Sequence, residues 1–213
     1  MAQEVQAKSK FIDMMAYSMF APNGKQSARA RFSWGILGDT VRMTVFTNVP
    51  EDTTNRGMIN ATLGHVEFTI FIAKFNAIAS GPNGASDKIE SLIPVRGDDN
   101  KITDQRIMGT LHFGKSDDGM VWIAIKDEGR PDIRFIFEPN RYTHFFTNGQ
   151  LCSPQENSIL YAKGRMSSLK TTVDAIVAQQ IQNKEPRQQG GQAPAQAGAT
   201  PKTPGGYDEE ISF

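Results

Sequence analysis

The chain has 213 residues, of which 38% are hydrophobic and 22% are charged, and its 23 basic and 23 acidic residues cancel. These values are ordinary for a soluble globular protein and exclude a fibre or a small disulfide scaffold. Because the net charge is zero, a nucleic-acid-binding function cannot rest on overall basicity, and the local distribution of charge becomes the informative feature.

The single cysteine, Cys152, has no second cysteine for an internal disulfide or a metal site. This favours a reducing cytoplasm, with a catalytic thiol as the less favoured alternative. The N-terminus lacks the basic start and apolar run of a secretory signal, and no stretch approaches membrane-spanning length. We therefore expect a cytoplasmic protein without membrane contact.

The first clear elements are two strands joined as a hairpin. Residues 8–20 are apolar and are left open between a short helix and an edge segment. Residues 28–36 then alternate with period two, and after a turn at Gly38 and Asp39 residues 41–46 do the same. The inward side chains are those of Ala30, Phe32, Trp34, Ile36, Val41, Met43 and Val45. The outward side chains include Arg29, Arg31, Arg42 and Phe46.

A helix is predicted over residues 61–80, because large apolar residues recur there at spacings of three and four. Gly81 and Pro82 end it, and the polar stretch around residues 97–100 is predicted to be a loop. Strands resume over residues 106–113, 121–126 and 133–138, giving five strands with one inserted helix. Their expected inward residues are Ile107, Gly109, Leu111, Phe113, Val121, Ile123, Ile125, Ile133, Phe135 and Phe137.

A long helix is predicted to start at Ser153, where Ser153 and Glu156 match a capping box with Pro154 at the first helical position. Its apolar stripe comprises Ile159, Ala162, Met166, Leu169, Val173 and Ile176. Such a stripe packs on the protein's own core or on a second copy, and we favour the first. A homo-oligomer stays open.

Residues 183–206 contain no large apolar side chain, so this segment is predicted to be a disordered linker. Large apolar residues return in the final segment, residues 207–213, beside three acids. Acids that steer and an aromatic plug suit a partner-docking peptide better than a solubilising tail. The predicted organisation is a binding domain over 1–182, a linker over 183–206 and a docking tip over 207–213.

This arrangement resembles the single-stranded DNA-binding proteins of bacteria and their phages, most closely the phage versions. The resemblance rests on the strand-rich body, the Gln- and Gly-rich linker and an acidic tip that ends in Phe213. It implies a mainly β, α+β fold: an oligonucleotide-binding (OB) fold, built as a five-stranded Greek-key barrel with an inserted helix and a long C-terminal helix. It further implies a host-cell location and replication, repair or recombination partners such as a polymerase, helicase, nuclease or recombinase. The tip residues carrying that role would be Asp208, Glu209, Glu210, Ile211 and Phe213.

Binding of single strands requires cations for phosphates and aromatic faces for unstacked bases. Between residues 22 and 48 four bases face one acid, and several outward positions combine arginine with an aromatic residue. The candidate DNA-binding residues are Arg29, Arg31, Arg42, Phe46, Trp122, Lys126, Arg134, Arg141 and Tyr142. For each arginine the competing interpretation is a solvated surface residue. For Phe46 and Trp122 it is packing beneath the long helix, whereas Trp34 is predicted to be core.

No enzyme is predicted, because phosphate-binding, HExxH and GxSxG motifs are missing and the three histidines are scattered. We expect no cofactor, catalytic residue or metal. Acid pairs at residues 98–99 and 117–118 leave a two-metal nuclease as a minor alternative. The stronger rival is a structural or adaptor protein whose β domain binds another protein.

Overall fold

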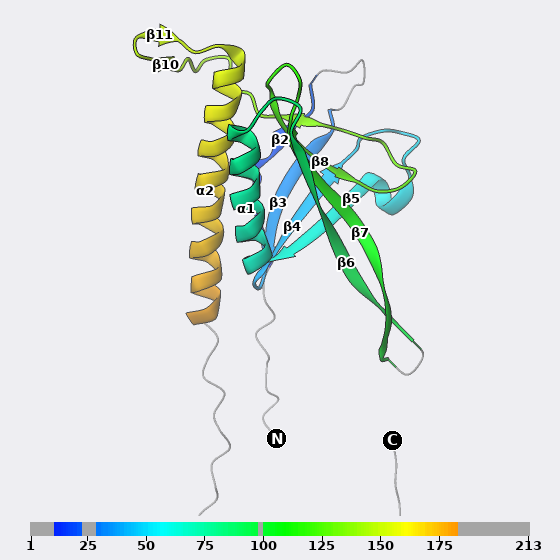
Figure 1. Cartoon of the computed structure of the whole chain (residues 1–213). Helices are drawn as coiled ribbons and strands as arrows, with labels where there is room; N and C mark the ends of the chain where they lie inside the picture. The colour runs from blue at the N-terminus through cyan, green and yellow to red at the C-terminus, as the bar shows by residue number, and fades with distance from the viewer. Residues whose placement is uncertain (1–10, 23–28, 98–99, 183–213) are drawn as a thin grey trace, which may run out of the picture. The chain divides into compact units, whose positions relative to one another are not determined.

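The computed structural model describes residues 11–22, 29–97 and 100–182, which form a mixed α+β fold of mostly antiparallel strands and two α-helices (Figure 1). The linker and the tip lie outside the described residues. In chain order the elements are β1 Ile12–Asp13, η1 Met15–Tyr17, β2 Met19–Phe20, β3 Arg31–Leu37, β4 Thr40–Phe46, η2 Thr54–Gly57, β5 Met58–Gly64, α1 His65–Ser80, β6 Ser86–Arg96, β7 Ile102–Lys115, β8 Val121–Lys126, β9 Phe135–Ile136, β10 Phe146–Thr147, β11 Gln150–Leu151 and α2 Pro154–Gln182.

The first sheet, sheet A, is an antiparallel meander of β3, β4 and β5, with β1 and β2 both paired to the free edge of β3. The predicted hairpin is confirmed, because β3 pairs with β4 throughout and Gly38 turns the chain with a φ of 65°. The predicted inward residues are buried, and Trp34 is core at 2% exposure. For residues 8–20 the edge-segment alternative is correct over 12–13 and 19–20.

The helix predicted over residues 61–80 is correct only from His65 onward, because residues 58–64 form β5. Ile59, Ala61 and Leu63 are buried with the period-two spacing of a strand. The strand runs into the helix at Gly64, with no intervening loop. The helical spacing of the following phenylalanines therefore hid the strand boundary.

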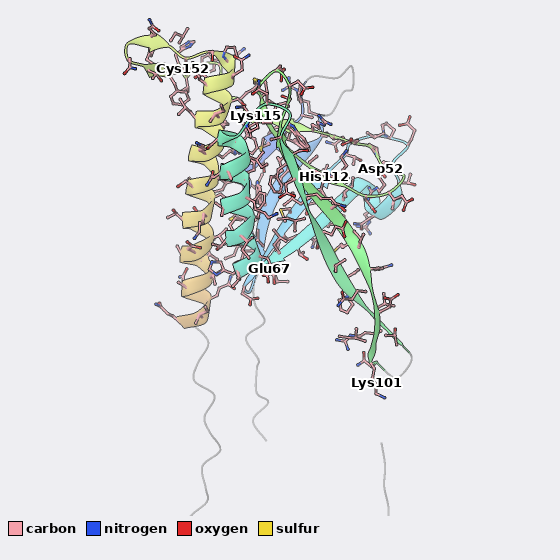
Figure 2. All side chains as sticks on the ribbon, in the orientation of Figure 1. Asp52, Glu67, Lys101, His112, Lys115 and Cys152 are labelled. Atoms are coloured by element: carbon pink, nitrogen blue, oxygen red, sulfur yellow. The ribbon has the colours of Figure 1, made fainter. Side chains whose placement is uncertain are left out.

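The second sheet, sheet B, has the order β6-β7-β8-β9. The predicted loop at Gly97 and Asn100 is the turn of a long hairpin formed by β6 and β7, whose strands extend on both sides of it. Lys101 marks the far end of this hairpin, away from the helices (Figure 2). There the strands expose most side chains of both faces, so their sequence lacks the alternation that a half-buried strand imposes. The first strand was missed, and the second begins at Ile102 rather than at residue 106.

The inward faces of β7 and β8 follow the prediction with one exception. Leu111, Phe113 and the three predicted residues of β8 are buried, whereas Ile107 is 52% exposed. A register shift between Ser91 and Leu92 precedes the pairing of Leu92 with Ile107, and it breaks the alternation at that point. The last predicted strand is paired only at Phe135 and Ile136.

The core lies between the inner faces of the two sheets and α1. Its centre is a network of aromatic rings from sheet A, α1 and β7, in which Phe71 and Phe113 meet edge to face at 5.2 Å between ring centroids. α2 packs beside α1 (Figure 1). The stripe of α2 joins this core, which confirms packing on the chain itself.

The start of α2 confirms the predicted capping box. Glu156 N–H donates to Ser153 Oγ at 3.2 Å, and Ser153 N–H donates to Glu156 Oε2 at 2.8 Å. The helix begins at Pro154 as expected. Among the described residues, no helix has the length and apolar character needed to cross a membrane.

The two sheets approach each other most closely where β5 meets β6 and β7. A Cβ built on Gly109 would lie 2.3 Å from the Asn60 carbonyl oxygen, so only glycine permits this approach. Nearby, Thr62 N–H donates to Ser91 Oγ at 2.9 Å. Within the described chain no backbone ladder joins the two sheets, so the predicted Greek-key barrel is not closed.

Candidate nucleic-acid interface

The outward side of sheet A collects polar, cationic and aromatic side chains on one surface, here called the A face. Its rows follow the strand register of β3, β4 and β5. The A face is formed by Arg31, Ser33, Arg42, Thr44, Phe46, Met58, Asn60 and Thr62, with Phe11 and Phe20 from the N-terminal segment.

The aromatic part of the A face is one continuous row across four strands. Phe20 pairs with Arg31, Arg31 with Phe46, and Phe46 with Met58. Directly paired residues lie on the same side of an antiparallel sheet, so these side chains are neighbours. Phe20 is 58% exposed, and the guanidinium carbon of Arg31 lies 4.4 Å from the Phe46 ring centroid. The row therefore offers an exposed ring beside a cation.

A third aromatic ring lies farther along the same face, outside this row. The ring of Phe11 covers Gly35, since a Cβ built there would lie 2.3 Å from Phe11 Cζ. Phe11 is 48% exposed. Gly35 pairs with Arg42, which places this ring too beside an arginine.

Asp13 also lies on this face, because it pairs with Gly35, and it accepts a hydrogen bond from Ser33 Oγ at 3.4 Å. No ion pair joins it to the described cations of the A face. Arg42 donates from Nε and Nη2 to the neutral Asn60 Oδ1, at 3.2 and 3.0 Å. Thr44 Oγ1 donates to the same oxygen at 2.8 Å. Within the described part of the chain, neither Arg31 nor Arg42 forms an ion pair, and Arg29 is exposed just before β3. These positive charges are free to attract phosphates.

The edge of the A face at Met58 is fixed by a buried ion pair. Arg130 and Asp52 contact at 2.7 Å with side chains only 6% and 5% exposed. Arg130 also donates to the Met58 carbonyl oxygen at 2.8 Å. Its hydrogen bonds hold the pKa of Asp52 below its usual range, with a further contribution from Thr47. The loop before β5 is thereby fastened to the turn after β8.

The outward side of sheet B holds the other predicted aromatic, Trp122, which is less accessible than expected. It is 6% exposed, because the Arg134 guanidinium carbon lies 4.5 Å from its ring centroid and the ring packs on Gly114. The expectation of an open stacking face here is wrong. The ring packs against its own sheet.

The charge on this side of sheet B is largely paired. Lys126 contacts Asp132 at 2.5 Å and Lys88 contacts Glu90 at 2.8 Å. Burial, followed by the positive charge of Lys126, lowers the pKa of His112. His112 lies near the C-terminal end of β7 (Figure 2), and the lowered pKa favours its neutral imidazole.

Arg141 and Tyr142 lie in a loop outside both sheets. The guanidinium carbon of Arg141 is 4.7 Å from the ring centroid of Tyr142, which is 75% exposed. Each predicted aromatic is thus paired with a predicted arginine. The three pairs lie on three separate parts of the chain. The predicted tip residues lie outside the described residues.

The sequence prediction missed Phe11 and Phe20 as site residues. Both belong to the segment that was left open between helix and edge strand. Their alternation with Ile12 and Met19 was the available signal, because Ile12 pairs with the inward Ile36 and Met19 with the inward Phe32. A segment this short has too few alternations to establish a period.

The alternatives of a metal site, a two-metal nuclease and a catalytic thiol have little support in the described residues. Among the residues that the structure describes, no group of three histidines, cysteines or acids could hold a metal ion. Asp118 accepts hydrogen bonds from Ser116 and Met120 within a turn, and residues 98–99 lie outside the described ranges. Cys152 is buried, beside the start of α2 (Figure 2).

Comparisons with protein-family models, curated proteins and solved structures found no match to this chain.

Proposed function

We propose that the chain is a single-stranded DNA-binding protein that coats and protects strands without sequence preference and binds them on the A face. The observation that carries the proposal is the row of Phe20, Arg31 and Phe46, where exposed aromatic surface adjoins an arginine that forms no ion pair within the described part of the chain. Unpaired cations attract phosphates, and aromatic faces accept any base, because every base has a π-face. This chemistry gives affinity with little sequence preference.

The order of the elements supports an OB-type domain. A meander of three strands, β3 to β5, is followed by α1 and then by the β6–β7 hairpin. OB domains bind oligonucleotides on the face of their second and third strands, which correspond here to β4 and β5. Arg42, Phe46 and Asn60 belong to that face. In this interpretation β8, β9 and α2 are additions to the domain.

The A face is favoured over the outward side of sheet B because of how the charges are paired. Lys126 has a carboxylate partner, and Trp122 is covered by Arg134. Releasing either group for a nucleic acid would break an existing contact. On the A face Arg31 likewise lies over Phe46, but Phe20 is 58% exposed and Arg42 is hydrogen-bonded to the neutral Asn60 rather than to a carboxylate.

The tip is proposed to dock replication, repair or recombination partners and to compete with DNA for the cationic A face. Support comes from the sequence of residues 207–213 alone. Acids attached through a linker act at a local concentration that can reach millimolar.

An adaptor function is the second candidate, and the distal β6–β7 hairpin favours it. Leu92 and Ile107 pair across the strands and are 50% and 52% exposed. Exposed apolar side chains of this kind are typical of protein interfaces.

Filter binding with a labelled oligo-dT and a matched duplex separates the two functions. A DNA-binding protein retains the single strand at low salt, prefers it to the duplex and releases it as salt rises. An adaptor retains neither, and that result would refute the proposal.

A further inference from the structure

The β10–β11 hairpin exposes two large apolar side chains. Phe146 and Leu151 pair across its strands and are 64% and 58% exposed. The strands are joined through Asn148 and Gly149, whose φ angles of 52° and 79° fit the type I′ turn that favours a two-residue hairpin. Directly paired residues lie on the same side of a hairpin, so Phe146 and Leu151 form one exposed apolar surface, here called the apolar pair.

The apolar pair belongs to a segment without charge. Residues 142–155 contain no Asp, Glu, Lys or Arg, although residues 142–144 and 146–151 are exposed. The cores of protein–protein interfaces are depleted of charge and enriched in aromatic residues. The hairpin projects beyond the start of α2 (Figure 1). Because a lone two-stranded hairpin is marginally stable in water, a surface that covers this one would stabilise it.

A cavity of about 480 Å³ lies against α2, close to the base of the hairpin. Its walls are mainly apolar and include Tyr17, Phe145, Leu160 and Tyr161. Phe145 directly precedes Phe146, so the cavity and the apolar pair are neighbours in the chain. The apolar pair does not fill the cavity of its own chain, since both side chains are more than half exposed. Cavities of this size with apolar walls are typical of binding sites.

Two residues of α2 suit the cavity to an aromatic ring. Glycine is among the least favourable residues inside a helix, yet Gly164 lines the cavity. A Cβ there would meet no described heavy atom within 4 Å beyond the helix's own backbone, so a ring from outside can approach the helix closely. Arg165 forms no ion pair within the described ranges, and its guanidinium carbon lies 5.6 Å from the Tyr161 ring centroid. A second ring over this guanidinium adds a cation–π contact and needs no carboxylate.

We propose that the apolar pair of one copy of this chain enters the cavity of a second copy, and that the second copy does the same in return. Both features belong to adjacent segments of one chain, so the surface that contains them is self-complementary, as a two-fold symmetric dimer requires. The uncharged hairpin supplies a ring and no acid, which matches an arginine without a carboxylate partner. The contact needs no nucleic acid and goes beyond the proposed function.

Sedimentation velocity of the full chain, freed of nucleic acid, tests the proposal. The centre of the contact is small, with one phenylalanine and one leucine from each copy, so we expect a reversible dimer at micromolar concentrations. Phe146→Lys should raise the dimer dissociation constant about 100-fold or more, because the symmetry removes two contacts at once and the lysine is repelled by Arg165. Gly164→Leu should do the same by filling the cavity, while its thermal midpoint stays the same or rises.

Leu92→Lys is the matched control, because Leu92 is also a half-exposed, cross-strand-paired residue of a hairpin. It should keep the dimer. A protein that stays monomeric at about 100 μM, or a dimer that persists in both Phe146→Lys and Gly164→Leu, would overturn the proposal. Equal loss of the dimer in Leu92→Lys would also overturn it.

Mixing the two variants tests the reciprocal arrangement. Phe146→Lys keeps the cavity, and Gly164→Leu keeps the apolar pair, so a mixed dimer regains one of the two contacts. We expect the mixture to dimerise more strongly than either variant alone. A mixture that stays as monomeric as its components would overturn the exchange of hairpins, and oligonucleotide binding of the same variants reports separately on the proposed function.

Discussion

Replacing Arg31 and Arg42 by alanine should make oligonucleotide binding much less sensitive to salt. Each phosphate neutralised on a single strand contributes about −0.7 to the slope of log affinity against log salt. With Arg29, Arg31 and Arg42 as the cations of the A face, the slope should be about −2. Between 50 and 200 mM salt, binding should then weaken about 20-fold.

The double variant keeps only Arg29 of these three cations, so its slope should be about −0.7 and its loss over the same salt range about 3-fold. Arg42→Lys should keep the contribution of this position to the salt slope, because lysine keeps the positive charge while the hydrogen bonds to Asn60 change. Lys126→Ala should leave the slope unchanged, since Asp132 already neutralises that lysine. The assay is fluorescence anisotropy with labelled oligo-dT at several salt concentrations.

A flattened slope in Lys126→Ala, together with an unchanged slope in the double arginine variant, would refute the assignment to the A face. It would place the phosphates on sheet B instead. A circular dichroism spectrum of each variant checks that the fold persists. This check matters because the Arg42 hydrogen bonds to Asn60 are lost in the double variant.

Phe20→Ala and Phe46→Ala should each weaken oligonucleotide binding by roughly 1–3 kcal/mol without changing the salt slope. If both variants bind as tightly as the unchanged protein, neither ring stacks on a base. Deleting residues 207–213 should tighten oligonucleotide binding at low salt and abolish the capture of partners in a pull-down from host lysate; if neither changes, the tip is only a solubilising tail. Arg130→Ala should lower the free energy of unfolding in urea by about 3 kcal/mol, because it leaves the buried Asp52 carboxylate without its partner, and a loss under about 1 kcal/mol would contradict this account. Because the folded pKa of Asp52 is lowered, its stabilising contribution is present above its ordinary value of 3.8 and is lost as pH falls through the folded pKa. Asp52→Asn should remove this part of the pH dependence, as measured by urea unfolding between pH 2 and 6.

The sequence predicted those elements whose burial is periodic and whose boundaries have local chemistry. Along β3 and β4 large apolar residues alternate with polar or small ones, so the period of two can be read from the sequence, although Ser33 and Thr44 of the other face are buried too. The start of α2 is set by Ser153 and Glu156, which act on each other's backbone and need no tertiary contact. Both patterns, the strand alternation and the capping pair, involve residues that are only a few positions apart in the sequence.

Tertiary structure decided the elements whose environment comes from distant segments. The distal part of the β6–β7 hairpin exposes most side chains of both faces, so its residues follow no hydrophobic period. β5 continues into α1 through Gly64 without a loop, so the helical spacing that follows concealed the boundary between strand and helix.

For the candidate site, too, the sequence predicted some features and the tertiary structure decided others. The sequence alone placed Arg31, Arg42 and Phe46 outward, because the face of a side chain follows from strand alternation. Whether an outward side chain is accessible depends on what other segments place over it. Arg134 comes to lie over Trp122 through the pairing of β8 with β9, and Phe20 reaches the A face only because β2 pairs with β3. These contacts depend on which strands pair with each other, so the alternation within a single strand could not reveal them.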